Sequence, residues 1–418
     1  MLPEGTAENL PAFYLYTDNG NPIISKEDYV TGTFSLSDEG VELAGGTLRI
    51  RGRGNSTWEW PKKPYRLKLD ESTPLLDMPK SKNWVLLANY ADKTLMRNDI
   101  AFMFSERIGM EYTTRAEYTE VWMNDVYQGV YQLVEHIRID SDRVDIHELE
   151  VTDTDAESVT GGYLFEIDFR MHKDYCLGEA GTRDPVCVEG VNTSREGVLC
   201  LDSSHGMNPL CLDEPETLLE PEWSVQREYI ETYFADMEVA LFGDNFADPD
   251  TGYAAYLDVD STVNYYIINE LFKNPDGASA SAYLTKKRND KLFFGPIWDF
   301  DLSLGNAGYG DVDKTDGWHI RKASWFARLF EDPAFEAKVK TRWQELKENG
   351  SFEVIFLYAE ARATWLQKAQ QRNFDLWPIF YWKTWYTRII MGSYNGEVAE
   401  MIRWQRERYN WMDKQLSN

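Results

Sequence analysis

Histidine, cysteine and basic side chains are scarce in this chain of 418 residues. It has 5 His, 4 Cys, and 43 Lys plus Arg against 70 Asp plus Glu, which gives a formal net charge of −27 at pH 7. Nucleic-acid backbones and anionic lipids are polyanions, so this charge argues against either as the main partner. The histidines are scattered and do not have the spacing of a metal site. The composition predicts a protein that does not bind nucleic acid, and it suits a protein outside the cell.

Several catalytic signatures are also missing. The sequence contains no G-x-S-x-G elbow, no Walker A loop, no H-E-x-x-H and no C-x-x-C. No run of eighteen apolar residues is present, which predicts that no segment spans a membrane. No signal peptide follows Met1. We therefore expect a mature or trimmed chain, located outside the cell or on its surface, from which the signal has been removed.

The four cysteines lie in one loop-like segment. Their spacings of 11, 13 and 11 differ from the C-x2-C pairs of zinc sites. Two disulfides formed in an oxidising compartment are the preferred interpretation, and the pairing is left open. Four free buried thiols are the alternative. The residues are Cys176, Cys187, Cys200 and Cys211.

The pattern of the chain changes twice, which predicts three segments. Residues 1–148 are rich in short β-type runs broken by Gly, Pro and Asn-Gly, with one helical stretch at 93–109. Residues 149–222 are irregular and carry the cysteines, with one clear strand, GGYLFEID. Residues 223–418 are mainly helical. The runs predicted as strands in the first segment are AFYLYT, TGTFSL, GTLRIRG, PYRLKLD and TEVWMN, the last followed by a turn at Asn124-Asp125.

The helical segment carries recognisable helix starts. Asp260 and Ser261 are candidate N-caps for the helix TVNYYIINELFKN, and Asp332 followed by Pro333 predicts another helix start. The stretch FDLWPIFYWKTWY is most simply explained by helix packing. A sugar-stacking surface is the alternative.

Two aspartates in this segment follow a suggestive order. A predicted helix ends at Asn274-Pro275 and is followed at once by Asp276; then SAYLTKK and LFFGPIW form a predicted hairpin that ends at Asp299. Because a hairpin returns its two outer ends to the same place, we expect these carboxylates to lie together. Oxygen ligands of this kind suit Mg²⁺ or Mn²⁺. The alternative is that Asp276 caps a turn and Asp299 lies in a solvated loop.

Protein kinases use the same order. In them a catalytic aspartate follows a helix, and a metal-binding aspartate closes the next hairpin in an Asp-Phe-Gly turn. The first acid orients or deprotonates the acceptor hydroxyl, and the second holds the metal that bridges the nucleotide phosphates. Here Trp298-Asp299-Phe300 occupies the place of that turn.

Four stretches carry a family resemblance, and they occur in the family's order. They resemble the spore coat protein H (CotH) family of atypical kinases, over about residues 11–418. The resemblance implies an α+β, protein-kinase-like fold of two lobes, with a β-rich N-terminal lobe and a mainly helical C-terminal lobe. The stretches are RIRGRGNSTWEWPKKPYRLKLD (49–70), WVLLANYADKTLMRNDIA (84–101), VYQGVYQLVEHI (126–137) and GPIWDFDLSLGN (295–306).

The resemblance also implies a site and its cofactors. Asp276 matches the catalytic aspartate and Asp299 the metal-binding aspartate, with Asp301 as a neighbouring metal ligand. It further implies ATP and Mg²⁺ (or Mn²⁺) as cofactors, and a protein whose Ser or Thr accepts the phosphate.

Nucleotide contacts are expected from the β-rich segment. Lys68 is the candidate for the phosphate-binding lysine, because strand alternation separates it from Leu67 and Leu69; an edge-strand lysine is the alternative. Arg53 and Asn55 are candidates for cradling phosphates, although a tight turn explains the RGRGNST motif equally well. Glu135 is a candidate nucleotide contact, and a charge at a strand end is the competing interpretation.

One position departs from the kinase pattern. Protein kinases place an asparagine five residues after the catalytic aspartate to hold a second metal, and here that residue is Ser281. A hydroxyl is a weaker, neutral ligand, so a second hypothesis stands: a catalytically weak or inactive surface scaffold, or a glycan-binding protein.

Overall fold

The computed structural model describes residues 2–173, 187–188, 191–192 and 195–417. The chain divides into two compact units, each assembled from separate stretches of sequence. The barrel unit comprises Met1–Phe102, Thr114–His136 and Glu353–Trp404. The sheet unit comprises Met103–Thr113, Ile137–Phe352 and Gln405–Asn418. The three consecutive segments expected from the sequence stay a prediction.

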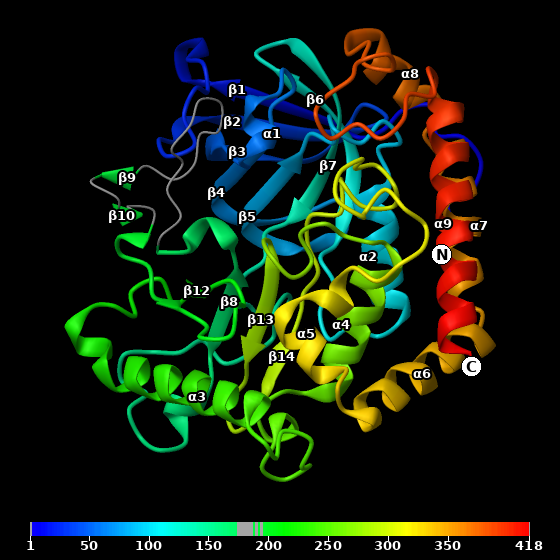
Figure 1. Ribbon diagram of the computed structural model, residues 1–418. Coiled ribbons are helices and arrows are strands. Elements are labelled where there is room, and N and C mark those ends of the chain that lie inside the picture. The colour runs from blue at the N-terminus through cyan, green and yellow to red at the C-terminus, as the bar shows by residue number, and fades with distance from the viewer. Residues whose placement is uncertain (1, 174–186, 189–190, 193–194, 418) are drawn as a thin grey trace. The chain divides into compact units, whose positions relative to one another are not determined.

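The barrel unit is built on strands that close on themselves (Figure 1). Neighbouring strands follow the order β1-β2-β3-β4-β5-β7-β6, and β1 pairs in parallel with β6, from Ala12↔Glu120 to Leu15↔Met123. This last pairing removes both sheet edges. The strands are β1 (Ala12–Thr17), β2 (Val30–Asp38), β3 (Val41–Gly52), β4 (Tyr65–Leu75), β5 (Met78–Leu87), β6 (Ala116–Met123) and β7 (Val126–Glu135).

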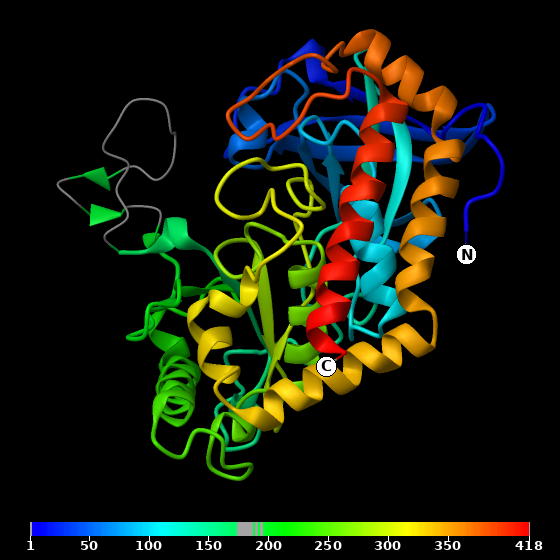
Figure 2. The same cartoon turned by 45° about the vertical axis from the view of Figure 1, so that its right-hand side comes forward.

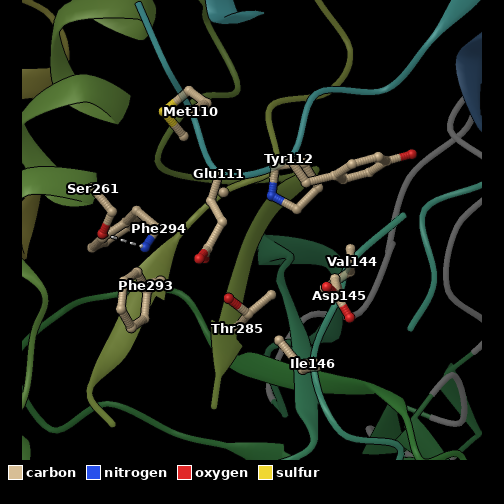
Figure 3. A pocket seen from close by; sticks show the side chains of 12 residues that line it. Met110, Glu111, Tyr112, Val144, Asp145, Ile146, Ser261, Thr285, Phe293 and Phe294 are labelled. Carbon is tan, nitrogen blue, oxygen red and sulfur yellow. Dashed lines mark hydrogen bonds between the residues drawn. The ribbon is translucent and has the colours of Figure 1, made fainter. Parts of the chain in front are cut away.

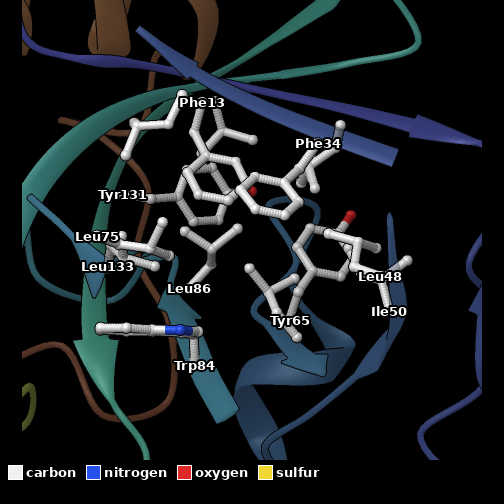
Figure 4. Packing of buried hydrophobic residues seen from close by; sticks show 14 of the residues in the cluster. Phe13, Phe34, Leu48, Ile50, Tyr65, Leu75, Trp84, Leu86, Tyr131 and Leu133 are labelled. Carbon is white, nitrogen blue, oxygen red and sulfur yellow. The ribbon is translucent and has the colours of Figure 1, made fainter. Parts of the chain in front are cut away.

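Alternate side chains of these strands fill the barrel (Figure 4). In β4 the inward residues are Tyr65, Leu67 and Leu69, all buried, whereas the residues between them are partly exposed. This period of two is the one expected from the sequence. Each fully buried leucine contributes about 1.5–3 kcal/mol relative to an exposed one, so the pattern fixes which face of each strand points inward.

Two-residue turns join several barrel strands. Between β6 and β7 the turn residues Asn124 and Asp125 have φ values of 48° and 64°. Positive φ at both positions is what a type I′ hairpin turn requires, and Asn and Asp tolerate it well. The predicted turn is confirmed.

The sheet unit carries a second, antiparallel sheet in the order β11-β12-β8-β13-β14. Its central strand β8 is the predicted GGYLFEID strand, and it pairs with β12 on one side and β13 on the other. Strands β9 and β10 form a separate pair. The strands are β8 (Tyr163–Ile167), β9 (Cys187–Val188), β10 (Val191–Asn192), β11 (Cys200–Leu201), β12 (Leu210–Glu214), β13 (Ala282–Lys286) and β14 (Leu292–Phe294).

Helix α4 of the sheet unit contacts β14 and α6 (Figure 2). Residues of α2, α7 and α9 are divided between the two units. The α-helices are α1 (Ser56–Glu59), α2 (Arg97–Arg107), α3 (Ser224–Phe242), α4 (Val259–Leu271), α5 (Ser324–Leu329), α6 (Pro333–Glu348), α7 (Ser351–Trp365), α8 (Gln367–Leu376) and α9 (Tyr394–Leu416). The short 3-10 helices are η1 (Asp18–Gly20), η2 (Ser158–Thr160), η3 (Phe169–Met171), η5 (Pro221–Trp223), η6 (Tyr253–Ala255) and η7 (Ile320–Lys322).

The N-cap hydrogen bonds of the structure show where two of the predicted helices begin. Asp332 caps α6 by accepting a hydrogen bond from the Ala334 N–H at 2.8 Å, as predicted. The start predicted for α4 is wrong by two residues. Asp258 is the cap and accepts from the Ser261 N–H at 2.7 Å, so Asp260 lies inside the first turn.

The prediction of a protein-kinase-like, two-lobed fold is wrong, although the α+β class is confirmed. The β-rich part is a closed barrel, because the β1–β6 pairing joins the two ends of the strand order. Residues 223–418 are mainly helical, as predicted, but their hairpin does not stand alone. Strands β8 and β12 from the cysteine-bearing segment extend it into a five-stranded sheet, because β8 pairs with β13 and β12 pairs with β8.

One disulfide is present among the described side chains. Cys200 and Cys211 face each other on β11 and β12, with Cα atoms 4.0 Å apart, and are joined. The prediction for Cys176 and Cys187 falls on side chains outside the described residues. Within the described part of the chain, no helix combines the length and the apolar content needed to cross a membrane.

Candidate active site

Asp276 lies in a loop that is tightly held after α4. The Asn274 side chain donates to the Asn269 amide oxygen at 3.1 Å and accepts from the Asp276 N–H at 3.2 Å. The Tyr265 hydroxyl donates to the Gly277 carbonyl at 2.8 Å. A Cβ on Gly277 would stand 2.5 Å from the Asn269 Oδ1, so only glycine fits. The loop backbone that carries Asp276 is therefore fixed from several sides.

The hairpin after this loop forms as predicted. β13 and β14 pair with the register Leu284↔Phe294, and Ser281 and Asp299 lie beyond the outer strand ends. The Ser281 Oγ is 3.5 Å from the Asp299 Oδ2, a weak contact. Both residues have positive φ, 52° and 64°. Non-glycine residues in this region cost about 1–3 kcal/mol each and occur often at functional sites, where surrounding structure holds them.

The predicted acids act on one another electrostatically. Burial and, to a smaller extent, the charge of Asp299 raise the pKa of Asp276 to about 7, while Arg170 acts in the opposite direction. The pKa of the Tyr309 phenol is raised mainly by burial, then by Asp276, Asp301 and Asp299. Negative charge is therefore concentrated at a site with little access to water, where binding of either a proton or a cation is favoured.

Two residues next to Asp276 were not predicted from the sequence. Asp168 caps η3, and its carboxylate accepts two bonds from the Arg170 guanidinium, Nε–Oδ1 at 2.7 Å and Nη2–Oδ2 at 2.6 Å. The Phe169 N–H donates to the Ser279 carbonyl at 2.8 Å, which ties η3 to the Asp276 loop. The bidentate pair fixes the positive charge that acts on Asp276. Only the D-x-R pattern after a strand hinted at it.

A cavity of about 470 Å³ opens beside the same loop. His319 lines it, and burial lowers the pKa of its imidazole below the usual value, so the ring is mostly neutral at pH 7. The His319 N–H donates to the Glu270 carboxylate at 2.8 Å, and Glu270 forms a fully buried ion pair with Arg408 at 2.6 Å. The remaining lining residues are Gly206, Met207, Asn208, Pro275, Ala278, Ser279, Asp311, Ile320, Lys322, Ala323 and Ser324.

A smaller cavity beside the hairpin is too small for a nucleotide (Figure 3). Its volume is about 30 Å³, enough for roughly one water molecule. Glu111 reaches it and forms an ion pair with Lys287, and the Phe294 N–H donates to the Ser261 hydroxyl at 3.2 Å. These contacts stabilise the hairpin and provide no space for a substrate.

The comparison with protein families decides the assignment. A family model described as CotH kinase protein matches residues 50–412, most of the chain. The chain belongs to the CotH kinase family. A comparison with curated proteins found no match. Membership supports kinase activity at the level of the family, and it implies a nucleotide, a protein substrate and a divalent cation in general.

Asp299 and Asp301 are the candidate cation ligands of this CotH family member. Among the residues that the structure describes, no group of three or more His, Cys, Asp or Glu is arranged to hold a metal. Mg²⁺ in phosphoryl-transfer sites is usually held by one or two carboxylates together with substrate phosphates and water. Asp299 and Asp301, with the repelling Asp276 nearby, supply carboxylates of that kind. The donor set fits a cation that binds together with nucleotide phosphates.

The other CotH candidate residues lie in the barrel unit and are described within it. Lys68 is half-buried on β4, on the face opposite Leu67 and Leu69, and stands across from Arg49 and Asn83. This is the side predicted from alternation, outside the packed barrel interior. Its contact with a nucleotide stays a prediction.

The motif around Arg53 and Asn55 is a tight turn. The Arg53 N–H donates to the Pro64 carbonyl at 3.3 Å, and the Asn55 carbonyl accepts from the Trp58 N–H at 3.1 Å. Gly54 has a φ of 80°, and a Cβ there would meet a side-chain hydroxyl at 2.1 Å. The glycine is therefore explained by the turn itself.

Glu135 ends β7 and is fully buried. Its carboxylate accepts from the Arg115 guanidinium at 2.8 Å and from the Arg115 N–H at 3.1 Å. Both of its oxygens therefore already have a donor within the barrel unit.

Proposed function

We propose that this member of the CotH kinase family is an ATP-dependent, Mg²⁺- or Mn²⁺-dependent kinase that phosphorylates Ser or Thr of a protein. The observation that carries the proposal is the electrostatic coupling of Asp276 and Asp299 at the open end of the β13–β14 hairpin. Family membership over residues 50–412 supports it independently.

The pKa of Asp276 suits the role of catalytic residue. A carboxylate with a pKa near the working pH both accepts a proton from the acceptor hydroxyl and releases it afterwards. The loop contacts from Asn274 and Tyr265 hold the backbone around Asp276, so this part of the loop does not have to be ordered during the reaction. The guanidinium of Arg170, which Asp168 holds in place, lowers the pKa of Asp276, whereas the charge of Asp168 itself raises it.

Asp299 and Asp301 would hold the cation in this proposal. When bound, the cation neutralises charge on the nucleotide phosphates. Lys68, Arg53, Asn55 and Glu135 are the proposed nucleotide contacts of the barrel unit.

Ser281 is the reason to keep a rival function. Its hydroxyl lies by Asp299, and in sequence it stands five residues after Asp276, where protein kinases have an asparagine. A catalytically weak scaffold or a glycan-binding protein would share the fold but would not transfer phosphate.

A location outside the cell or at its surface forms part of the proposal. The Cys200–Cys211 disulfide and the acidic composition support an oxidising, extracellular environment.

Titration calorimetry with ATP, with and without Mg²⁺, tests the proposal. We expect ATP binding that requires the cation and that Asp299→Ala weakens by at least about tenfold, since a charge-assisted ligand is lost. Asp290→Ala is the matched control, because Asp290 is an exposed aspartate at the opposite end of the same hairpin. ATP binding of equal strength in EDTA, or in Asp299→Ala, would contradict the proposed site.

A further inference from the structure

The tryptophan-rich loop between α8 and α9 is anchored by part of its aromatic side chains. Phe380 packs on Phe374 with ring centroids 4.3 Å apart, and Trp382 meets Trp60 edge-on at 4.8 Å. The Lys93 ammonium donates to the carbonyls of Phe380 at 3.3 Å and Trp382 at 3.2 Å. The packing interpretation of this stretch therefore holds for the inward residues, and the loop backbone is held in place.

Other aromatic residues of the same loop point outward. Tyr381 is 79% exposed and Trp385 is 69% exposed. A single exposed ring needs no explanation, but an exposed ring at the edge of a cavity is a feature of ligand-binding sites, and Tyr381 is such a ring. Gly392 supports the Tyr381 ring from one side, since a Cβ at this glycine would lie 3.0 Å from the ring. An aromatic platform is thus presented with its orientation set by the chain.

Tyr381 borders a cavity of about 260 Å³ whose lining combines rings with planar polar groups. Gln371 and Asp375 are exposed on α8, and the Gln370 amide is oriented by a bond to the Gln367 carbonyl at 3.1 Å. A Gln amide both donates and accepts hydrogen bonds, and an ionised carboxylate accepts through two oxygens, which together match adjacent hydroxyl groups. The lining residues are Gln370, Gln371, Phe374, Asp375, Pro378, Phe380 and Tyr381.

We propose that this cavity and the Tyr381 platform form a binding site for a neutral, β-linked oligosaccharide. The flat apolar face of a pyranose ring stacks on an aromatic ring, while its equatorial hydroxyls meet Gln371 and Asp375. The cavity lies just below the usual range of about 300–1,000 Å³ for drug-sized ligands, so it accepts one sugar ring of a longer chain.

The negative charge of the site and of the whole chain favours neutral ligands among those that stack on exposed aromatic rings. The Asp375 carboxylate borders the cavity, and the chain carries a net charge of −27. Both repel sulfated or uronic acid polymers. The site uses none of the acids proposed for phosphate transfer, so it stands or falls separately from the kinase function.

Calorimetry of the full chain with cellohexaose and xylohexaose tests the site. We expect wild type to bind at least one of them, and Tyr381→Ala to weaken binding by about tenfold or more. Gln371→Ala should weaken it as well. Tyr16→Ala is the matched control, because Tyr16 is a 40% exposed tyrosine elsewhere in the barrel unit, and it should bind like wild type. Unchanged thermal unfolding midpoints confirm that the variants are folded.

Three results would overturn the proposal. The first is the absence of binding by wild type at millimolar oligosaccharide. The second is equal binding by wild type and Tyr381→Ala. The third is tighter binding of a proline-rich peptide or of heparin than of either hexasaccharide.

Discussion

Replacing Asp276 by asparagine should change how stability depends on pH. The folded protein raises the pKa of Asp276 from 3.8 to about 7, mainly through burial. Between these two values the folded state binds a proton that the unfolded chain does not bind, so this group lowers stability as the pH rises from about 4 to about 7. At 1.36 kcal/mol per pKa unit the loss reaches at most about 4 kcal/mol at pH 8.

Asparagine has no charge to desolvate, so Asp276→Asn should match wild type near about pH 3, where the Asp276 carboxyl is protonated in both the folded and the unfolded state. It should be more stable than wild type by up to about 4 kcal/mol at pH 8. Urea unfolding in EDTA, followed by tryptophan fluorescence across this range, measures the difference. Asp290→Asn should follow the wild-type curve, because Asp290 is exposed. A difference in unfolding free energy between Asp276→Asn and wild type that stays below about 0.5 kcal/mol at every pH would refute the claim that the Asp276 carboxylate is buried and repelled by Asp299.

Two further predictions concern stability. Replacing Cys200 and Cys211 together by serine should lower the free energy of unfolding in denaturant by about 3 kcal/mol, because the disulfide closes a short loop. If the variant is also about 3 kcal/mol less stable than wild type whose disulfide has been reduced, the disulfide is not the cause of the loss. Asp258→Ala should cost about 1 kcal/mol through the lost α4 cap, while Asp260→Ala should cost less than about 0.5 kcal/mol. Thermal or urea unfolding measures both aspartate variants, and equal losses would show that the cap is misassigned.

Local patterns in the sequence predicted many elements because the forces involved are local. AFYLYT coincides with β1, and the Asn124-Asp125 turn follows from residues that tolerate positive φ. The turn between β4 and β5 could not be found this way. Its Leu76 and Asp77 also have positive φ, 47° and 61°, and leucine carries no turn signal.

The features that the sequence did not predict depend on contacts between residues that lie far apart in the chain. Closure of the barrel depends on the contact of β1 with β6, residues more than one hundred positions apart, and neither strand carries a mark of its partner. The start of α4 depends on the Asp258 N–H, which donates to the Leu292 carbonyl at 2.9 Å and keeps Asp258 outside the helix.

In the candidate site, too, residues close in sequence could be predicted and those brought in by long-range pairing could not. Asp276 and Asp299 could be related because a single hairpin joins them in sequence. Arg170 could not, since it reaches Asp276 through the pairing of β8 with β13, for example Ile167↔Ala282.

Transfer of radiolabelled phosphate from ATP tests the central claim most directly. The assay would compare wild type, Asp276→Asn and Asp290→Asn with Mg²⁺ and a generic protein acceptor, and would score label on both the acceptor and the chain itself. We predict incorporation by wild type and by Asp290→Asn, and a loss of at least about a hundredfold in Asp276→Asn, the range expected for a catalytic acid or base. No incorporation by wild type, or equal incorporation by Asp276→Asn, would contradict phosphate transfer at this site.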